Sequence, residues 1–160
     1  MGAHDIRKAE LPRDADSVRL LLEAYVQELG VDLGFQGFSE EVRDLARAYP
    51  PPGGLWLAFT SSGPVGAVGL RPLSGGDAEL KRLFVRHEAR GVGLGRALVE
   101  TALGVARVGG FRGVRLDTLP GMSVAQALYA DLGFVPISAY RGNPLPGTQF
   151  LELRFEGGPS

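Results

Sequence analysis

The chain has 160 residues, 44% of them hydrophobic, which is the size and composition of one ordinary globular domain. Its 17 basic and 18 acidic side chains nearly cancel, so the global charge gives no reason to propose a nucleic-acid partner. The absence of cysteine excludes a disulfide framework, a thiolate metal site and a cysteine nucleophile, and we expect no metal.

The N-terminal segment 1–14 is polar and charged and lacks the apolar core of a signal peptide. No apolar run approaches the roughly 18 residues that a membrane span needs. The sequence therefore predicts a cytoplasmic protein with no membrane partner. We expect a single domain over residues 1–160, with a disordered tail at 157–160.

Hydrophobic spacing and turn residues predict a chain that alternates between strands and helices. The expected elements are a strand at 5–9, helices at 16–29 and 40–48, strands at 55–60, 65–70 and 78–86, a helix at 94–108, a strand at 114–117, a helix at 123–132, and strands at 134–137 and 150–155. Three antiparallel strands followed by a strand-helix-strand crossover indicate an α/β (α+β) fold. We expect a mixed, mostly antiparallel central sheet of about six or seven strands, flanked by about four helices.

Three local signals refine these elements. Gly30 fits the C-terminal stop of the first helix, and Ser39 fits an N-cap for the second. In the strand at 78–86, Lys81 and Arg82 interrupt the alternation of apolar and polar residues, which allows a β-bulge there.

The strongest signal is the glycine turn, Arg90-Gly91-Val92-Gly93-Leu94-Gly95, between a strand and a helix. Backbone N–H groups at such a turn and the positive end of the helix favour a pyrophosphate. The spacing differs from the G-x-G-x-x-G fingerprint of dinucleotide-binding folds, although Asp117 ends the next strand about 20 residues on, as a ribose-binding acid does. A purely structural turn is the other alternative.

The glycine turn resembles the Arg/Gln-x-x-Gly-x-Gly/Ala signature of the GCN5-related N-acetyltransferase (GNAT) superfamily. Residues 78–85 resemble the strand that precedes this signature, and residues 125–134 resemble a later helix with its Leu-Gly-Phe ending. This resemblance implies the GNAT fold and an acetyl-CoA-dependent N-acetyltransferase. One departure is Met122, which stands where many relatives have an asparagine that contacts the cofactor.

The resemblance also assigns residues to acetyl-CoA. The strand backbone would pair with the pantetheine arm, and the turn would hold the phosphates. The residues assigned in this way are Leu83, Phe84, Val85, Arg90, Gly91, Val92, Gly93, Leu94, Gly95 and Arg96. The alternative for each arginine alone is a solvated surface residue.

Acetyl transfer to an amine requires a base for the amine and an acid for the leaving thiolate. The resemblance places Tyr129 as the acid near the sulfur and Glu79 as the base, with direct attack in a ternary complex. The alternatives are a core tyrosine for Tyr129, and for Glu79 a solvent-facing residue paired with Lys81 or Arg82. Glu28 and Asp32 are other candidate bases.

The acceptor is expected to be a small primary amine, bound by Asp32, Phe35, Phe38 and Tyr140, although ordinary loop packing explains each of these residues equally well. Function therefore has two further alternatives: a non-catalytic acetyl-CoA-binding regulatory module and a nicotinamide dinucleotide enzyme. The sequence leaves the oligomeric state open, and a homodimer is compatible with it.

Overall fold

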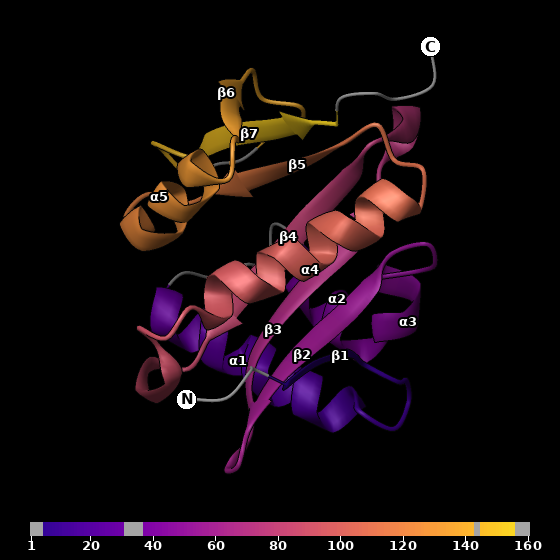
Figure 1. Ribbon diagram of the computed structural model, residues 1–160, viewed down its shortest axis with the longest axis vertical. Helices are drawn as coiled ribbons and strands as arrows, with labels where there is room; N and C mark the ends of the chain where they lie inside the picture. Colours follow the sequence, from indigo (N-terminus) through magenta and orange to yellow (C-terminus); the bar gives the residue numbers. More distant parts are fainter. Residues whose placement is uncertain (1–4, 31–36, 143–144, 156–160) are drawn as a thin grey trace.

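A seven-stranded sheet runs through the molecule, in the order β1-β2-β3-β4-β5-β7-β6 (Figure 1). The computed structural model describes residues 5–30, 37–142 and 145–155. All neighbouring strands are antiparallel except β4 and β5. The strands are β1 Asp5–Lys8, β2 Gly54–Thr60, β3 Gly63–Pro72, β4 Ala78–Val85, β5 Gly113–Thr118, β6 Val135–Ile137 and β7 Gln149–Arg154. This arrangement confirms the predicted mixed, mostly antiparallel sheet.

Helices cover both faces of this sheet. They are α1 Ala15–Leu29, α2 Phe38–Arg43, α3 Leu45–Ala48, α4 Leu94–Val108 and α5 Ser123–Asp131, with short 3₁₀ turns η2 Ser74–Gly76 and η3 His87–Ala89. Gly30 ends α1 in the left-handed conformation (φ 67°), as predicted. None of the helices in the described ranges combines the length and apolarity that a bilayer crossing requires.

The prediction of one helix at 40–48 was wrong. The chain breaks at Asp44, which leaves the helical region (φ −138°, ψ 79°) and caps α3 by accepting a hydrogen bond from the Arg47 N–H at 3.2 Å. Ser39 is also not an N-cap, because α2 begins earlier and Gly37 precedes it in the left-handed conformation (φ 71°). Short polar side chains compete for backbone hydrogen bonds, so such a segment carries more than one cap signal.

Two hydrophobic cores form on the two faces. On one face, Leu98 and Ala102 of α4 pack with Leu80 of β4 and their neighbours. On the other, Leu21 of α1 packs with Leu57 of β2. Each fully buried leucine contributes about 1.5–3 kcal/mol relative to an exposed one. The cores hold α1 and α4 on opposite sides of β4, the strand that the site depends on.

Strand β4 contains the expected bulge. Its pairing with β3 shifts between Ala67↔Phe84 and Gly69↔Lys81, and Arg82 adopts a positive φ of 60°. The extra residue turns the side chain of Arg82 toward α2.

Strands β4 and β5 run side by side only at their beginnings. They pair at Ala78↔Val114 and Glu79↔Arg115 and then diverge, while β5 remains paired with β7 as far as Thr118 (Figure 1). We call the opening between the two strands the wedge. The N-terminus of α4 follows the end of β4, and that of α5 follows the end of β5, so both helices begin near the open end of the wedge.

Candidate active site

A groove of about 690 Å³ lies at the open end of the wedge, within the usual size range of ligand pockets. Residues of α1, β4, the glycine turn, α4 and the start of α5 line it. Nine of the ten residues that the sequence assigns to acetyl-CoA are among them, and the tenth, Val92, is not. The nine are Leu83, Phe84, Val85, Arg90, Gly91, Gly93, Leu94, Gly95 and Arg96.

The glycine turn presents its backbone to this groove. Gly91 and Gly93 have φ values of 87° and 85°, which L side chains rarely adopt, and no atom lies within 4 Å of a Cβ built on either residue. The first hydrogen bond of α4 runs from Ala97 N to Gly93 O at 3.0 Å. The N–H groups of the first turn of α4 therefore have no acceptor within the helix, and they can bind an anion. The geometry fits the phosphates of acetyl-CoA.

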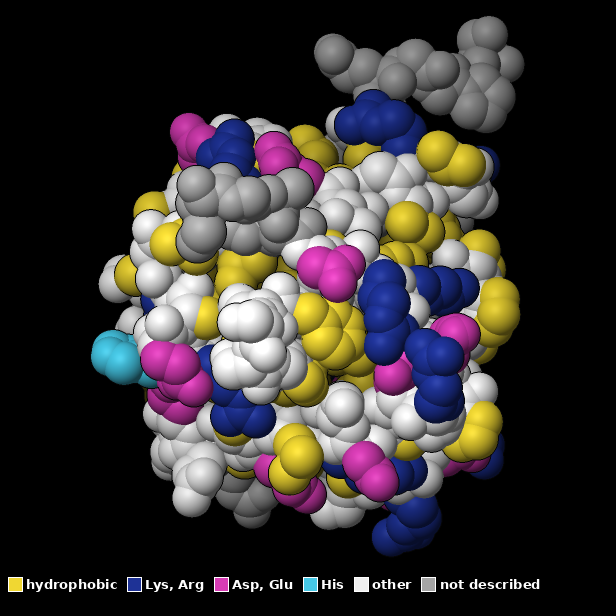
Figure 2. Space-filling view, turned by 60° about the horizontal axis from the view of Figure 1, so that its bottom comes forward, with side chains coloured by type: hydrophobic (Ala, Val, Ile, Leu, Met, Phe, Trp, Pro, Cys, Tyr) yellow, Lys and Arg dark blue, Asp and Glu magenta, His cyan; other side chains and the backbone are white. Residues whose placement is uncertain are grey.

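The arginines of this segment have partners within the protein. Arg90 donates from Nε to the Val85 carbonyl at 2.8 Å and forms an ion pair with Glu28 of α1. Arg96 forms ion pairs with Asp131 and Glu100. Acidic and basic side chains are mixed over the face shown in Figure 2, with the largest group of Lys and Arg on its right side. Recognition of a phosphate at the glycine turn therefore depends on local backbone geometry as well as charge.

An inner cavity of about 30 Å³ lies deeper in the wedge. Tyr25, Leu83 and Met122 line both this cavity and the groove, so the two spaces adjoin. The remaining lining residues are Leu80, Lys81, Arg82, Asp117, Thr118, Leu119 and Tyr129. A substrate arm that follows the wedge from the groove would reach this cavity.

Tyr129 is buried in the wall of the inner cavity, with 6% of its surface exposed. Its ring packs against Phe134 at a centroid distance of 5.6 Å. Burial, together with the charge of Asp117, raises the pKa of Tyr129 well above its ordinary value of 10. The phenol is therefore protonated at neutral pH and can act as a donor.

Met122 takes a structural place at the start of α5. Its sulfur lies 3.3 Å from the Leu119 N–H, and its side chain lines both the groove and the inner cavity. Met122 therefore lies beside the two spaces in which we expect the cofactor, and it offers a thioether where many relatives carry an amide.

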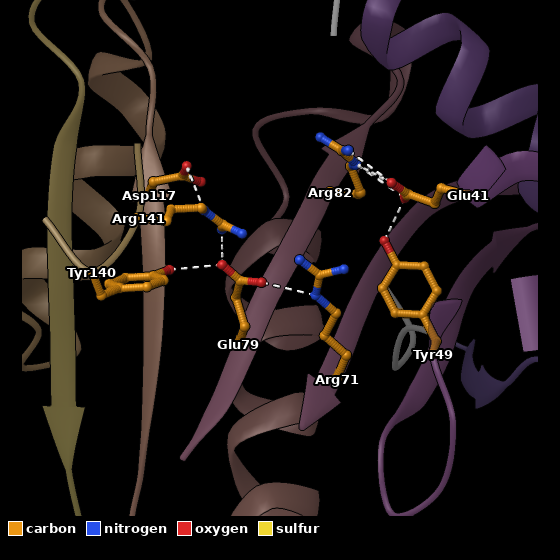
Figure 3. A network of polar contacts seen from close by, with 8 residues as sticks. All are labelled: Glu41, Tyr49, Arg71, Glu79, Arg82, Asp117, Tyr140 and Arg141. Atoms are coloured by element: carbon orange, nitrogen blue, oxygen red, sulfur yellow. Dashed lines mark hydrogen bonds and ion pairs between the residues drawn. The ribbon is translucent and has the colours of Figure 1, made fainter. Parts of the chain in front are cut away.

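Glu79 is fully buried at the closed end of the wedge (Figure 3). Arg71 of β3 donates to its carboxylate at 2.8 Å, Tyr140 donates its hydroxyl at 2.7 Å, and Arg141 forms an ion pair with it. The expected alternative, a solvent-facing residue paired with Lys81 or Arg82, was wrong because both the burial and the partners differ.

Glu79 is not one of the described residues that line the groove or the inner cavity. Two guanidinium groups near a carboxylate favour its charged form. The role of Glu79 as a base stays a prediction. The hydrogen bond from the Tyr140 hydroxyl to Glu79 joins two of the residues predicted for the site.

A second buried group lies beside the first. Arg82 bonds to both carboxylate oxygens of Glu41 in α2, and Tyr49 donates its hydroxyl to Glu41 at 2.5 Å (Figure 3). Burial raises the pKa of Glu41, but the bonds from Arg82 and Tyr49 outweigh this effect, and the pKa is lowered overall. Phe38, predicted for the acceptor side, stacks under Arg82 at 5.4 Å. Asp32 and Phe35, predicted for the same side, lie outside the described residues.

Sequence reasoning did not assign Lys81, Arg82 and Tyr25 to the site, although all three line the inner cavity. One signal was available: two adjacent cations between Leu80 and Leu83 in a strand. Asp117 was considered only as a ribose ligand. Asp117 instead lines the inner cavity, and its carboxylate lies 3.7 Å from Arg141 Nε. The sheet has a single parallel pair, so the dinucleotide alternative is not supported. The described residues contain no group of three or more His, Asp or Glu able to hold a metal.

Comparison with known proteins gives the same fold and chemistry. The family model described as "Acetyltransferase (GNAT) family" matches residues 19–134. An uncharacterized N-acetyltransferase of Schizosaccharomyces pombe is 36% identical over 151 residues, which cover 92% of this chain and 93% of the relative.

Solved structures share the architecture. A GNAT-family acetyltransferase of Staphylococcus aureus superposes with a TM-score of 0.79 at 20% identity, over 95% of this chain and 99% of that one. A proposed streptothricin acetyltransferase of Bacillus anthracis, solved in complex with acetyl coenzyme A, superposes with a TM-score of 0.59 at 22% identity, over 67% of this chain and 65% of that one.

Proposed function

The chain belongs to the GNAT family of acetyltransferases, and on this basis we propose that it transfers the acetyl group of acetyl-CoA to the primary amine of a small acceptor. We place this activity in one domain in the cytoplasm. The observation that carries the proposal is that the groove at the glycine turn adjoins the inner cavity lined by Tyr129, since the two spaces share three lining residues.

Acetyl-CoA binding would divide between two stretches of backbone. The first turn of α4 and the glycine turn would hold the pyrophosphate. The edge of β4 from Leu83 to Val85, which β5 no longer covers, would pair with the pantetheine arm. The thioester would then lie near the inner cavity.

Direct attack of the amine in a ternary complex is the economical route, because the chain has no cysteine to carry the acetyl group. Tyr129 would protonate the departing thiolate, since its raised pKa keeps the hydroxyl protonated. The acceptor would approach between two predicted residues: Phe38 at the start of α2, which stacks on Arg82, and Tyr140 after β6, which bonds to Glu79.

The test is CoA release in the presence of a panel of primary amines. Because the protein has no cysteine, a thiol reagent reports free CoA without a background from the enzyme. We expect release that depends on the amine, and mass spectrometry should find the acetylated amine. Tight acetyl-CoA binding without release for any amine would favour a regulatory module and contradict the proposal.

A further inference from the structure

We propose that Lys81, rather than Glu79, takes the proton from the acceptor amine. The inference rests on the proposed function and deepens it by naming the base. It makes Lys81 and Tyr129 a base and an acid that face one small cavity.

The first observation is position. Lys81 lies on β4 just beyond the last residue paired with β5, where the wedge begins to open. It lines the inner cavity together with Tyr129, and only 6% of its surface is exposed. Glu79, two residues earlier, lines neither space. A base must come within hydrogen-bond reach of the reacting amine, directly or through one water, and Lys81 meets this geometric condition better.

The second observation is the balance of charge around Lys81. The network in Figure 3 contains three arginines and three carboxylates, which are Arg71, Arg82, Arg141, Glu41, Glu79 and Asp117. Ion pairs within this network join every arginine to at least one of the carboxylates. Within the residues that the structure describes, the side chain of Lys81 makes no hydrogen bond or ion pair. A charged Lys81 would be an uncompensated cation in this group, whereas a neutral amine leaves it balanced.

Burial and the groups that face Lys81 lower its pKa on balance. Burial lowers its pKa first, and Arg82 on the same strand and Arg71 on β3 lower it further, while Glu41 of α2 and Asp117 of β5 raise it. Tyr25 in α1 and Tyr129 in α5 also line the cavity. The net effect lowers the pKa of Lys81 from 10.5 to about 7. A base whose pKa lies near the working pH is the efficient choice.

The third observation is the choice of residue type. The chain has 15 arginines and only two lysines, Lys8 and Lys81. Arginine stays charged under all ordinary conditions, whereas a buried lysine readily loses its proton. The one buried lysine, whose amine can be neutral, therefore lies at a position where a neutral amine could accept a proton.

The proposed step balances as follows. The acceptor ammonium gives one proton to Lys81 Nζ, and its lone pair forms the N–C bond to the thioester carbon. The C–S bond breaks, and its electron pair leaves with the sulfur. Tyr129 protonates the thiolate and regains a proton from the nitrogen that has become the amide. Lys81 releases its proton to solvent, so the reaction yields one proton overall.

The experiment compares Lys81→Met, Lys81→Arg and Glu79→Gln, using the best amine from the panel as acceptor. Activity depends on unprotonated Lys81, so the wild-type rate should rise with pH through about 7 and then level off. Near neutral pH, Lys81→Met and Lys81→Arg should both lose roughly 10²-fold in kcat and lack this inflection, while Glu79→Gln should retain it. The loss should shrink at high pH, where the amine deprotonates itself.

Two results would overturn the proposal. Full activity of Lys81→Arg would mean that a fixed cation at this position suffices, as for binding an anionic acceptor. An inflection that disappears in Glu79→Gln and persists in Lys81→Met would return the base to Glu79. Acetyl-CoA affinity and circular dichroism of each variant show whether the fold and the groove survive the change.

A second measurement needs no acceptor. With labelled lysine, the NMR spectrum contains only Lys8 and Lys81, and exposed Lys8 serves as the internal reference. We expect the Lys81 signal to titrate with a midpoint at about pH 7. A Lys81 midpoint at the ordinary lysine value of 10.5 would refute a neutral Lys81 even if the enzyme is active. If no amine releases CoA, the proposed function fails, while the lysine titration still gives its own answer.

Discussion

The glycine turn and the charged network of Figure 3 lie at opposite ends of the wedge, and they are built in different ways. The turn consists of consecutive residues, and its binding groups are backbone N–H groups exposed by glycines with positive φ. The charged network joins side chains far apart in the sequence: Arg82 bonds to Glu41 across 41 residues, and Tyr140 to Glu79 across 61.

The two regions differ in the free-energy cost of leaving a polar group without its partner. Backbone groups at the glycine turn stay solvated in the empty groove, so they cost little when no phosphate is bound. The charged network is buried, so each ion must keep its partners or lose several kcal/mol to desolvation. We therefore expect changes in the charged network to affect mainly stability, and changes at the glycine turn to be distinguished by their effect on acetyl-CoA affinity.

The largest effect should follow Glu41→Ala. This change leaves the Arg82 guanidinium, with a side chain 3% exposed, without its carboxylate. Removing one partner of a buried ion pair costs about 3–5 kcal/mol, so the free energy of unfolding should fall by that amount in urea denaturation.

Glu28→Ala provides the matched control, because it removes the acid of another Arg–Glu pair whose side chains are 41% and 50% exposed. Exposed pairs contribute about 0–1 kcal/mol, so this variant should unfold almost like the wild type. Equal losses for the two variants would mean that burial does not set the cost.

The same difference explains what the sequence could predict. The succession of strands along the chain, the bulge near Arg82 and the C-terminal stop at Gly30 depend on patterns within a few residues, and the structure confirms them. The split of the second helix at Asp44 was not predictable, because Asp44 and Ser39 offer competing caps and the difference between them is small.

For the site, nine of the ten residues predicted for acetyl-CoA do line the groove, but few of the residues around the inner cavity were predicted. A glycine turn can be predicted because the residues that form it are consecutive in the sequence. The partners of Glu79 come from two other segments, and no spacing in the sequence specifies that Arg71, Tyr140 and Arg141 converge there. Lys81 could be singled out only once the wedge and its lining were known.

Tyr129→Phe tests the acid and should have the next largest effect. The change removes only the hydroxyl, so the packing against Phe134 should persist. If the hydroxyl protonates the thiolate, kcat should fall roughly 10²-fold, which is about 2.7 kcal/mol, with acetyl-CoA affinity nearly unchanged. Normal turnover with reduced stability would instead identify a core tyrosine.

Lys81 should also make stability depend on pH in an unusual direction. Its pKa is about 7 in the folded protein against 10.5 ordinarily, so between these values the unfolded chain holds a proton that the folded protein lacks. Stability then rises with pH, by about 1.36 kcal/mol per unit at most. Relative to Lys81→Met, the wild type should gain about 2 kcal/mol between pH 7.5 and 9.5 in parallel urea titrations. A constant difference between the two proteins would contradict a lowered pKa.

The smallest effect should follow Gly93→Val at the other end of the wedge. Gly93 and Gly110 flank α4 with the same φ of 85°, and a Cβ on either residue meets no atom within 4 Å. Both valine variants therefore suffer similar backbone strain, but only Gly93 lines the groove. Gly93→Val should weaken acetyl-CoA binding at least tenfold, about 1.4 kcal/mol, by calorimetry, because the side chain occupies the space in which a phosphate would approach the backbone. Gly110→Val should lose similar stability and keep full affinity. If both variants bound acetyl-CoA equally well, Gly93 would have no part in the phosphate site. The contrast between a glycine turn that binds through its backbone and a charged network built from side chains would then no longer hold for the glycine turn.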